Sequence, residues 1–297
     1  MIKIAVIGED YQANIIESLS LVDDFEITAY LNTKPSVNTE NSKITSYQDY
    51  NLLLSLVDAL YINIPTEEYY KYATEAIKLG KHVFLSETTP FNSKKIETLI
   101  KLAIEAKVVV QSGHSARFSP LFLHLKTEIN NPLFIEVHRS FDQIISEKFF
   151  FDAVLKDVDI VLKKINNPIK KIAAHGFLSA DKNIEMLNAR IEFSNTAIAH
   201  LVFHKISKTA SHQYNFFQKN KNIHLDLTKK TYTIDAKNEK EIHQITNKID
   251  TEYNINTEFS IFASSIKLQK LIPVLLEETL SNYATTHTIF DLIKNKF

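Results

Sequence analysis

The chain has 297 residues, of which 44% are hydrophobic and 23% are charged, and its formal net charge is −1. This composition is typical of a globular protein long enough for two hydrophobic cores, and the near-zero charge argues against nucleic acid or an acidic membrane surface as a partner. The absence of cysteine excludes disulfides, thiolate catalysis and cysteine-ligated metals.

The hydropathy pattern favours a protein that is neither exported nor inserted into a membrane. No segment approaches eighteen uninterrupted apolar residues, so we expect no membrane span. The start, MIKIAVIGED, is typical of a strand followed by a turn rather than of a signal peptide. We therefore expect a cytoplasmic protein.

The first 115 or so residues alternate between strand-like and helix-like patterns. Buried parallel strands are predicted in the runs KIAVIG, FEITAYLN, ALYINIP, KHVFLSE and VVVQSG. Helices are predicted between them in YQANIIESLSLV, NLLLSLVD, TEEYYKYATEAIKLG and NSKKIETLIKLAIEAK. Gly80 is expected to close the third helix, and Asn92 or Ser93 to cap the fourth. This succession predicts an α/β domain with a doubly wound parallel sheet.

The pattern changes near residue 118. Residues 134–141 alternate like a half-exposed strand, and a helix is predicted in FFFDAVLKDVDIVLKKI. Further strands are predicted from about residue 170 in KKIAAHGFL, NARIEFSN, AIAHLVFHKIS, HQYNFFQ, NIHLDLT and TYTIDA. They favour an antiparallel sheet with one covered face, followed by helices near 257–270 and 274–295. We predict two domains, 1–118 and 119–297, and we expect TKKTYTIDAKNEKE to be a charged surface hairpin or loop.

The chain resembles the Gfo/Idh/MocA oxidoreductases in the segments PTEEYYKYATEAIKLGKHVFLSETTPF and SGHSARFSP. The resemblance continues in order through FIEVHRSF, FFFDAVLKDVDIVL, NARIEFSNTAIAHLVFHKIS and FFQKNKNIHLDL. It implies a Rossmann domain followed by an α+β domain with an open-faced antiparallel sheet. It also implies hydride exchange between NAD or NADP and a sugar or nucleotide sugar. The sheet is expected to form a homodimer or homotetramer, and the apolar run AIAHLVF would suit such an interface.

The glycine-rich turn of this family is altered here. Gly8 is present, but Asp10 and Ala13 stand in place of the other two glycines. Either the Asp10 carboxylate caps the following helix in place of a phosphate, which would weaken or abolish cofactor binding, or it turns outward and the cofactor binds. The resemblance implies cofactor contacts at Gly8, Asp10, Tyr11, Asn32, Pro65, Thr66 and Glu87.

The lysine of the family's E-K-P motif has no counterpart in this chain. An alignment without gaps places the triplet on Ser86, Glu87 and Thr88, and one inserted residue moves it to Glu87, Thr88 and Pro90. Neither alignment supplies the cation that, in the family, positions the nicotinamide and the substrate.

The family's D-x-x-x-H-D-x-D helix matches DAVLKDVD, with Lys156 in the histidine position. The spacing places Asp152, Lys156 and Asp159 on one helical face. Together with Asp157, these carboxylates favour the charged form of the lysine and make it a poor base. We expect Lys156, Glu87 and Asp152 to form the catalytic site, with a contact between Glu87 and Lys156. The alternative is a surface ion pair worth less than about 1 kcal/mol.

Four residues are candidates for substrate binding. Arg117 and His114 lie in the SGHSARFSP turn, where Arg117 contacts substrate or pairs with an acidic residue between the domains, and His114 is a ligand contact or a packing residue. Asp157 follows Lys156 in the sequence. His204 and Lys205 occupy the positions where the family often has Ser-Arg. The other histidines match no metal-ligand spacing, so no metal is predicted.

Three functions are compatible with these observations. The chain is an NAD(P)-dependent oxidoreductase with impaired catalysis, a non-catalytic binding or partner subunit with a degenerate active site, or a scaffold that assembles through its sheet. The family pattern supports the first function. The departures at the glycine turn, the lysine position and the histidine position support the second.

Overall fold

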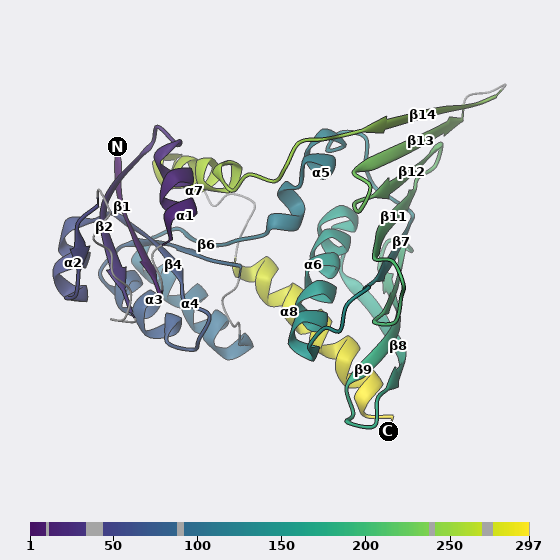
Figure 1. Cartoon of the computed structure of the whole chain (residues 1–297), viewed down its shortest axis with the longest axis horizontal. Coiled ribbons are helices and arrows are strands. Elements are labelled where there is room, and N and C mark those ends of the chain that lie inside the picture. Colours follow the sequence, from purple (N-terminus) through teal and green to yellow (C-terminus); the bar gives the residue numbers. More distant parts are fainter. Residues whose placement is uncertain (10–11, 34–43, 88–91, 238–240, 269–275, 297) are drawn as a thin grey trace. The chain divides into compact units, whose positions relative to one another are not determined.

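The computed structural model describes residues 1–9, 12–33, 44–87, 92–237, 241–268 and 276–296 (Figure 1). Contacts divide the chain into two compact units. The first contains Met1–Phe118 and Asn254–Ser281, and the second contains Ser119–Tyr253 and Asn282–Phe297. The sequence predicts two domains, 1–118 and 119–297. Because this prediction also gives each domain a function, it stays a prediction.

The first unit is built on a parallel sheet with the strand order β3-β2-β1-β4-β5-β6. The strands are β1 (Ile2–Gly8), β2 (Phe25–Asn32), β3 (Ser46–Tyr47), β4 (Ala59–Asn63), β5 (His82–Leu85) and β6 (Val110–Ser112). The helices are α1 (Ala13–Ser20), α2 (Tyr50–Leu56), α3 (Tyr69–Lys78), α4 (Ser93–Ala106), η1 (Ser115–Phe118) and α7 (Asn256–Leu268). This order is that of a Rossmann sheet, and it reverses direction between β1 and β4.

Local signals in the sequence define several of these elements. Asn92 caps α4 as predicted, because its side-chain oxygen accepts from the backbone N–H of Lys94 at 3.0 Å. Asp49 caps α2 in the same way through Asn51. Gly80 follows α3 with φ of 71°, a left-handed conformation that glycine adopts without strain.

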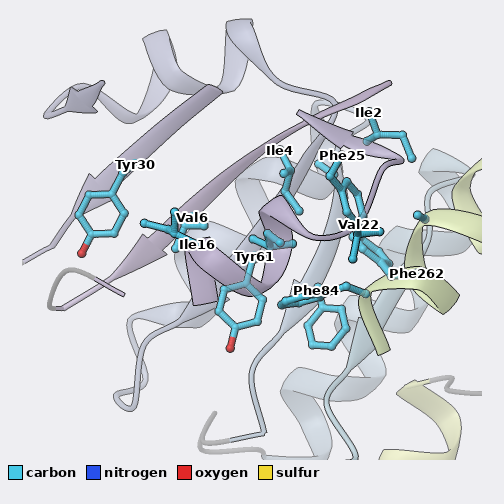
Figure 2. Close-up of a cluster of buried hydrophobic side chains, with 14 residues drawn as sticks. Ile2, Ile4, Val6, Ile16, Val22, Phe25, Tyr30, Tyr61, Phe84 and Phe262 are labelled. Atoms are coloured by element: carbon cyan, nitrogen blue, oxygen red, sulfur yellow. The ribbon is translucent and has the colours of Figure 1, made fainter. Parts of the chain in front are cut away.

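The core of the first unit joins its N-terminal strands to α7 (Figure 2). Phe84 of β5 lies 5.3 Å from Phe259 and 5.5 Å from Phe262, measured between ring centroids. Phe259 also meets Tyr61 of β4 edge-on at 5.5 Å. Residues far along the chain therefore complete the core of the Rossmann sheet.

The second unit contains an eight-stranded sheet with the order β14-β13-β12-β11-β7-β10-β9-β8. Its strands are β7 (Phe134–Ser140), β8 (Ile169–Leu178), β9 (Ile184–Phe193), β10 (Ile198–His204), β11 (Ser211–Phe217), β12 (Lys221–Asp226), β13 (Thr231–Lys237) and β14 (Ile242–Lys248). Its helices are α5 (Pro120–His124), α6 (Glu147–Ile165) and the C-terminal part of α8 (Leu276–Lys294). All strand pairs are antiparallel except β7 with β10, which is parallel.

One face of this sheet is covered by helices of the same unit. Phe203 of β10 packs against Phe150 of α6, with 6.1 Å between ring centroids. Leu201 is fully buried on the same face, whereas His200 and His204 alternate onto the opposite face. We call this opposite face the open face. Ala199, Leu201 and Phe203 of AIAHLVF are thus used in the unit's own core, and the role of this run in an oligomer interface stays a prediction.

The sequence missed two elements of this unit, α5 and β14, although β13 and β14 do form the hairpin expected in the charged segment. No described helix is long and apolar enough to cross a bilayer.

Candidate functional site

The carboxyl end of β1 carries the first candidate cofactor residue. Gly8 pairs with Asn32 at the end of β2 and with Asn63 at the end of β4. Its carbonyl oxygen accepts a hydrogen bond from the backbone N–H of Thr33 at 2.9 Å. Gly8 therefore lies where the strand order reverses, which is where open α/β sheets bind ligands.

The N-terminus of α1 follows this strand end. Gln12 is the N-cap residue, but its side chain does not cap the helix; its Oε1 accepts from Nδ2 of Asn63 at 2.7 Å. Among the described residues, none in the first turn is acidic. Backbone N–H groups and the positive end of the helix dipole are therefore suited to a phosphate. Asp10 and Tyr11 lie outside the described residues, so the competition between Asp10 and a phosphate stays a prediction.

The Glu87 carboxylate follows β5 and is bound by the start of η1. Its Oε1 accepts from the backbone N–H of Ser115 at 3.1 Å, and its Oε2 accepts from the Ser115 hydroxyl at 2.6 Å. Gly113 permits this approach, because a Cβ there would meet the Glu87 backbone nitrogen at 3.0 Å. The position that corresponds to the family lysine is thus held by an anchored anion in the ungapped alignment. Thr88 and Pro90, which belong to the two alternative alignments of the E-K-P triplet, lie outside the described residues.

His114 and Arg117 have partners within the first unit. The His114 ring lies 3.0 Å from the Ser112 hydroxyl and 3.1 Å from the Thr279 hydroxyl, through Nε2 in both cases. Arg117 is largely buried and forms an ion pair with Glu278. These contacts favour the packing role for His114 and the ion-pair role for Arg117, and they leave their predicted substrate contacts untested.

Exposed turn residues follow β4. Pro65 and Thr66 lie in the turn between β4 and α3, and the Thr66 carbonyl accepts from the N–H of Tyr69 at 3.3 Å. This is the same end of the sheet as Gly8 and Asn63, because parallel strands share their carboxyl edge.

In the second unit, Asp157 of α6 is fully buried and tied to two strands. Its Oδ1 accepts from His212 Nε2 at 2.9 Å and from the Tyr214 hydroxyl, and its Oδ2 accepts from Arg139 at 3.3 Å. Burial alone would raise the pKa of Asp157, but His212, Arg139 and the Tyr214 hydroxyl hold that pKa below its usual value. Burial and the neighbouring carboxylate raise the pKa of Tyr214 well above its ordinary value. Asp157 therefore joins α6 to β7 and β11, and its predicted contact with substrate stays a prediction.

The other polar residues of the motif lie along α6. Asp152 and Lys156 are half-buried one helical turn apart, as the spacing predicts. Asp159 is buried and accepts a hydrogen bond from Asn282 of α8. The expected Glu87–Lys156 contact would join residues of the two units, and it stays a prediction.

His204 lies apart from these residues. It is on the open face of the sheet, and α6 packs on the covered face through Phe150 and Phe203. The structure therefore does not bring His204 together with Lys156. Its predicted role as a substrate residue stays a prediction.

Several polar contacts were not expected from the sequence. They are Gln12 with Asn63, Ser115 with Glu87, and the Asp157 partners Arg139, His212 and Tyr214. The positions of Asn63 and Ser115 just after strands were an available signal, since such positions gather at one sheet edge. Over the part of the chain that the structure describes, no three His, Cys, Asp or Glu side chains converge as a metal site.

Comparison with known proteins finds a family model that matches the first part of the chain. Residues 2–114 match the model of the Gfo/Idh/MocA oxidoreductases, described as an oxidoreductase family with an NAD-binding Rossmann fold. UDP-N-acetylglucosamine 3-dehydrogenase of Acidithiobacillus ferrooxidans is 21% identical over 64% of this chain and 62% of that enzyme. Oxidoreductase P35 of Formosa agariphila is 31% identical over 24% of this chain and 22% of that protein. These matches span less than two thirds of either relative.

Solved structures share the fold over nearly the whole chain. The crystal structure of UDP-N-acetylglucosamine 3-dehydrogenase GnnA from Acidithiobacillus ferrooxidans has a TM-score of 0.84 and 16% identity, covering 99% of this chain and 98% of that one. A dehydrogenase (MviM) from Clostridium difficile has a TM-score of 0.81 and 16% identity, covering 98% and 99%. At this identity the likeness is one of fold. Residues 2–114 thus match the NAD-binding Rossmann part of the Gfo/Idh/MocA oxidoreductase family, and the chain as a whole shares the fold of these dehydrogenase structures.

Proposed function

We propose that the chain is an NAD(P)-dependent oxidoreductase that acts on a sugar or nucleotide sugar and whose catalysis is weakened. The observation that carries the proposal is the N-terminus of α1, which no described side chain caps and which follows Gly8 where the strand order reverses. The proposed substrate class follows the name of the relative, a UDP-N-acetylglucosamine dehydrogenase.

The residues at this strand end fit a dinucleotide. Gly8 lets a pyrophosphate approach the backbone, and the first N–H groups of α1 would donate to it. Asn32 at the end of β2 would hydrogen-bond the adenosine ribose, and Pro65 and Thr66 lie at the same edge. NAD or NADP supplies the hydride acceptor or donor when it is bound.

Weakened catalysis is proposed because two charged positions are altered. Glu87 replaces the expected lysine in the ungapped alignment, and Ser115 holds its carboxylate in place. Lys156 replaces the expected histidine on α6. The negative charge of Glu87 near the nicotinamide would change how cofactor and substrate are positioned. The amine of Lys156 in place of an imidazole would change the proton transfer.

The anchored Glu87 also supports a second candidate, a non-catalytic subunit that keeps the fold and binds a ligand or a partner. The two candidates differ in turnover rather than in fold. For both we propose a small sugar-type ligand and a homodimer or homotetramer formed through the sheet of the second unit, and we expect no nucleic acid or membrane partner. Sedimentation velocity would measure the assembly.

Nicotinamide fluorescence titration tests cofactor binding. We expect NADH or NADPH to bind more weakly than about 1 mM if Asp10 fills the phosphate position, and Asp10→Gly to tighten binding about tenfold or more, because it removes a competing anion. Glu17→Gln, which removes a charge from the exposed side of α1, is the matched control and should change little. Sub-millimolar binding by the native chain would contradict the occlusion by Asp10. Failure of both proteins to bind would contradict the nucleotide site.

Turnover separates the two candidates. A panel of UDP-sugars and sugar acids would be assayed with the native chain and with the triple variant Asp10→Gly, Glu87→Lys and Lys156→His. We expect slow turnover by the native chain and faster turnover by the variant. No turnover by either, with intact cofactor binding, would favour the non-catalytic subunit.

A further inference from the structure

A pocket lies on the open face of the second unit's sheet. Its volume is about 540 Å³, within the range of small-ligand sites. It is lined by the strand residues His138, Ser140, His204, Ser211, Gln213 and Asp226, and by the loop residues Ser207, Thr209, Ala210, Thr228 and Lys229. None of these residues belongs to the proposed catalytic site, because α6 covers the other face of the sheet.

The protonation of His204 can be assigned from one hydrogen bond. Its Nδ1 lies 3.0 Å from the carbonyl oxygen of Ile206. A carbonyl oxygen only accepts, so Nδ1 carries the hydrogen, and in the neutral ring Nε2 keeps its lone pair. Metal-binding histidines are arranged in this way, with one ring nitrogen donating to a backbone carbonyl and the other free to coordinate an ion.

His138 is the neighbour of His204 in the pocket. The two residues lie on the adjacent parallel strands β7 and β10, two positions apart in register. Their ring centroids are 5.5 Å apart and their planes are inclined by 65°. Two imidazole nitrogens that share a tetrahedral ion at about 2.0–2.1 Å place their ring centroids about 5 Å apart. The ring separation is therefore close to the one that two imidazoles on a single ion require.

Apart from the two histidines, the residues that line the pocket carry no net formal charge, so they do not repel a cation. The Asp226 carboxylate is balanced by Lys229, whose Nζ lies 3.2 Å away, and it accepts from Gln213 Nε2 at 3.0 Å. The Gln213 carbonyl oxygen takes no part in that bond. Gln213 stands directly across from His138 in the register of β7 and β11, so an oxygen donor is close to the two rings.

We propose that His138 and His204 bind one divalent transition-metal ion on the open face, with water in the remaining coordination positions. Imidazole ligands favour zinc, copper or nickel over magnesium or calcium. With only two imidazoles, affinity is modest, which agrees with the lack of a third His, Cys, Asp or Glu ligand among the described residues. The ion would clamp β7 to β10 and to the loop at Ile206.

Calorimetric titration of the untagged chain with Zn²⁺, and electron paramagnetic resonance with Cu²⁺, test this proposal. We expect one ion per chain, two nitrogen ligands in the copper spectrum, and no competition from Mg²⁺. His138→Ala and His204→Ala should each weaken binding about tenfold or more. His200→Ala is the matched control on the same face, because its Nε2 is engaged by Asn188 at 2.9 Å, and it should leave binding unchanged.

His138→Ala is the decisive variant, since no intramolecular hydrogen bond of the described residues depends on its ring. The melting temperature without metal would verify that the variant is folded. Unchanged zinc affinity in folded His138→Ala would overturn the proposal. A single nitrogen ligand in the copper spectrum, or equal weakening by His200→Ala, would also overturn it.

Discussion

At the residue scale, Asp157 shows how a buried carboxylate is stabilised in this fold. Two oxygens receive hydrogen bonds from His212, Tyr214 and Arg139, and the side chain has no exposed surface. Removing a charge from water is costly unless it is paired and hydrogen-bonded. The network therefore stabilises the packing of α6 on the sheet, and through α6 it fixes the helix that carries Lys156.

We expect Asp157→Asn to lower the free energy of unfolding at pH 7 by about 3 kcal/mol, because the new amide cannot accept from all three donors and leaves Arg139 unpaired. The pKa of Asp157 is lower in the folded chain than the value of about 3.9 in an unfolded one. Its contribution is therefore complete above about pH 4 and is lost as the pH falls through the lowered pKa. Urea unfolding at pH 7 and near pH 3 would measure this.

The exposed Asp181→Asn is the control for that experiment and should change stability by less than about 0.5 kcal/mol. An equal loss of stability in Asp157→Asn at both pH values would contradict the role of its charge.

At the element scale, the close approach of β8 to its neighbours depends on one glycine. A Cβ on Gly176 would lie 2.4 Å from the carbonyl oxygen of Met186 on β9 and 2.9 Å from a methyl carbon of Ile293 on α8. The first contact is with backbone, which cannot move away without disturbing the β8–β9 pairing. Gly176 thus allows the C-terminal turn of α8 to pack onto the edge of the sheet.

We expect Gly176→Ala to destabilise the chain by about 1–3 kcal/mol, the usual cost of overpacking. Gly80→Ala should cost about 1 kcal/mol for a different reason, because its left-handed φ of 71° is strained for alanine although no atom lies within 4 Å. Thermal unfolding would compare the two. Hydrogen exchange should quicken at β8 and at the end of α8 only in Gly176→Ala, and equal exchange in both variants would contradict the steric account.

At the scale of the whole molecule, the chain returns to its first unit after forming most of the second. Residues Asn254–Ser281 belong to the first unit, and α7 places Phe259 and Phe262 in the Rossmann core (Figure 2). The stability of the first unit therefore depends on a helix that begins only at Asn256, in line with the 144-residue separation of His114 and its hydrogen-bond partner Glu258.

We expect Phe259→Ala to lower the free energy of unfolding by about 3–5 kcal/mol, since it removes a buried ring that touches β4 and β5. Hydrogen exchange should quicken in β1 and β4 more than in β10 and β11. Phe177→Ala is the control, because that ring is 68% exposed, and it should cost little. Equal weakening of β10 and β11 would contradict the assignment of α7 to the first unit.

The sequence alone determined the elements and the fold class. Apolar runs predicted β1, β2, β4, β5 and β6, and alternation predicted the strands of the second sheet except β14. Burial of one or both faces of a strand produces such local patterns. Motif order also indicated the resemblance to the Gfo/Idh/MocA oxidoreductases, whose family model matches residues 2–114. These signals depend on neighbours along the chain, so they are visible without a structure.

Only the tertiary structure decided which side chains meet. It paired Asp157 with His212, 55 residues away, and it bound Glu87 to Ser115. It placed His204 on the face opposite α6 and beside His138, whereas the sequence showed only its position in the chain. The physical reason is that strand register and the choice of covered face arise from packing between distant segments, and a one-residue change of register would move every such side chain to the other face.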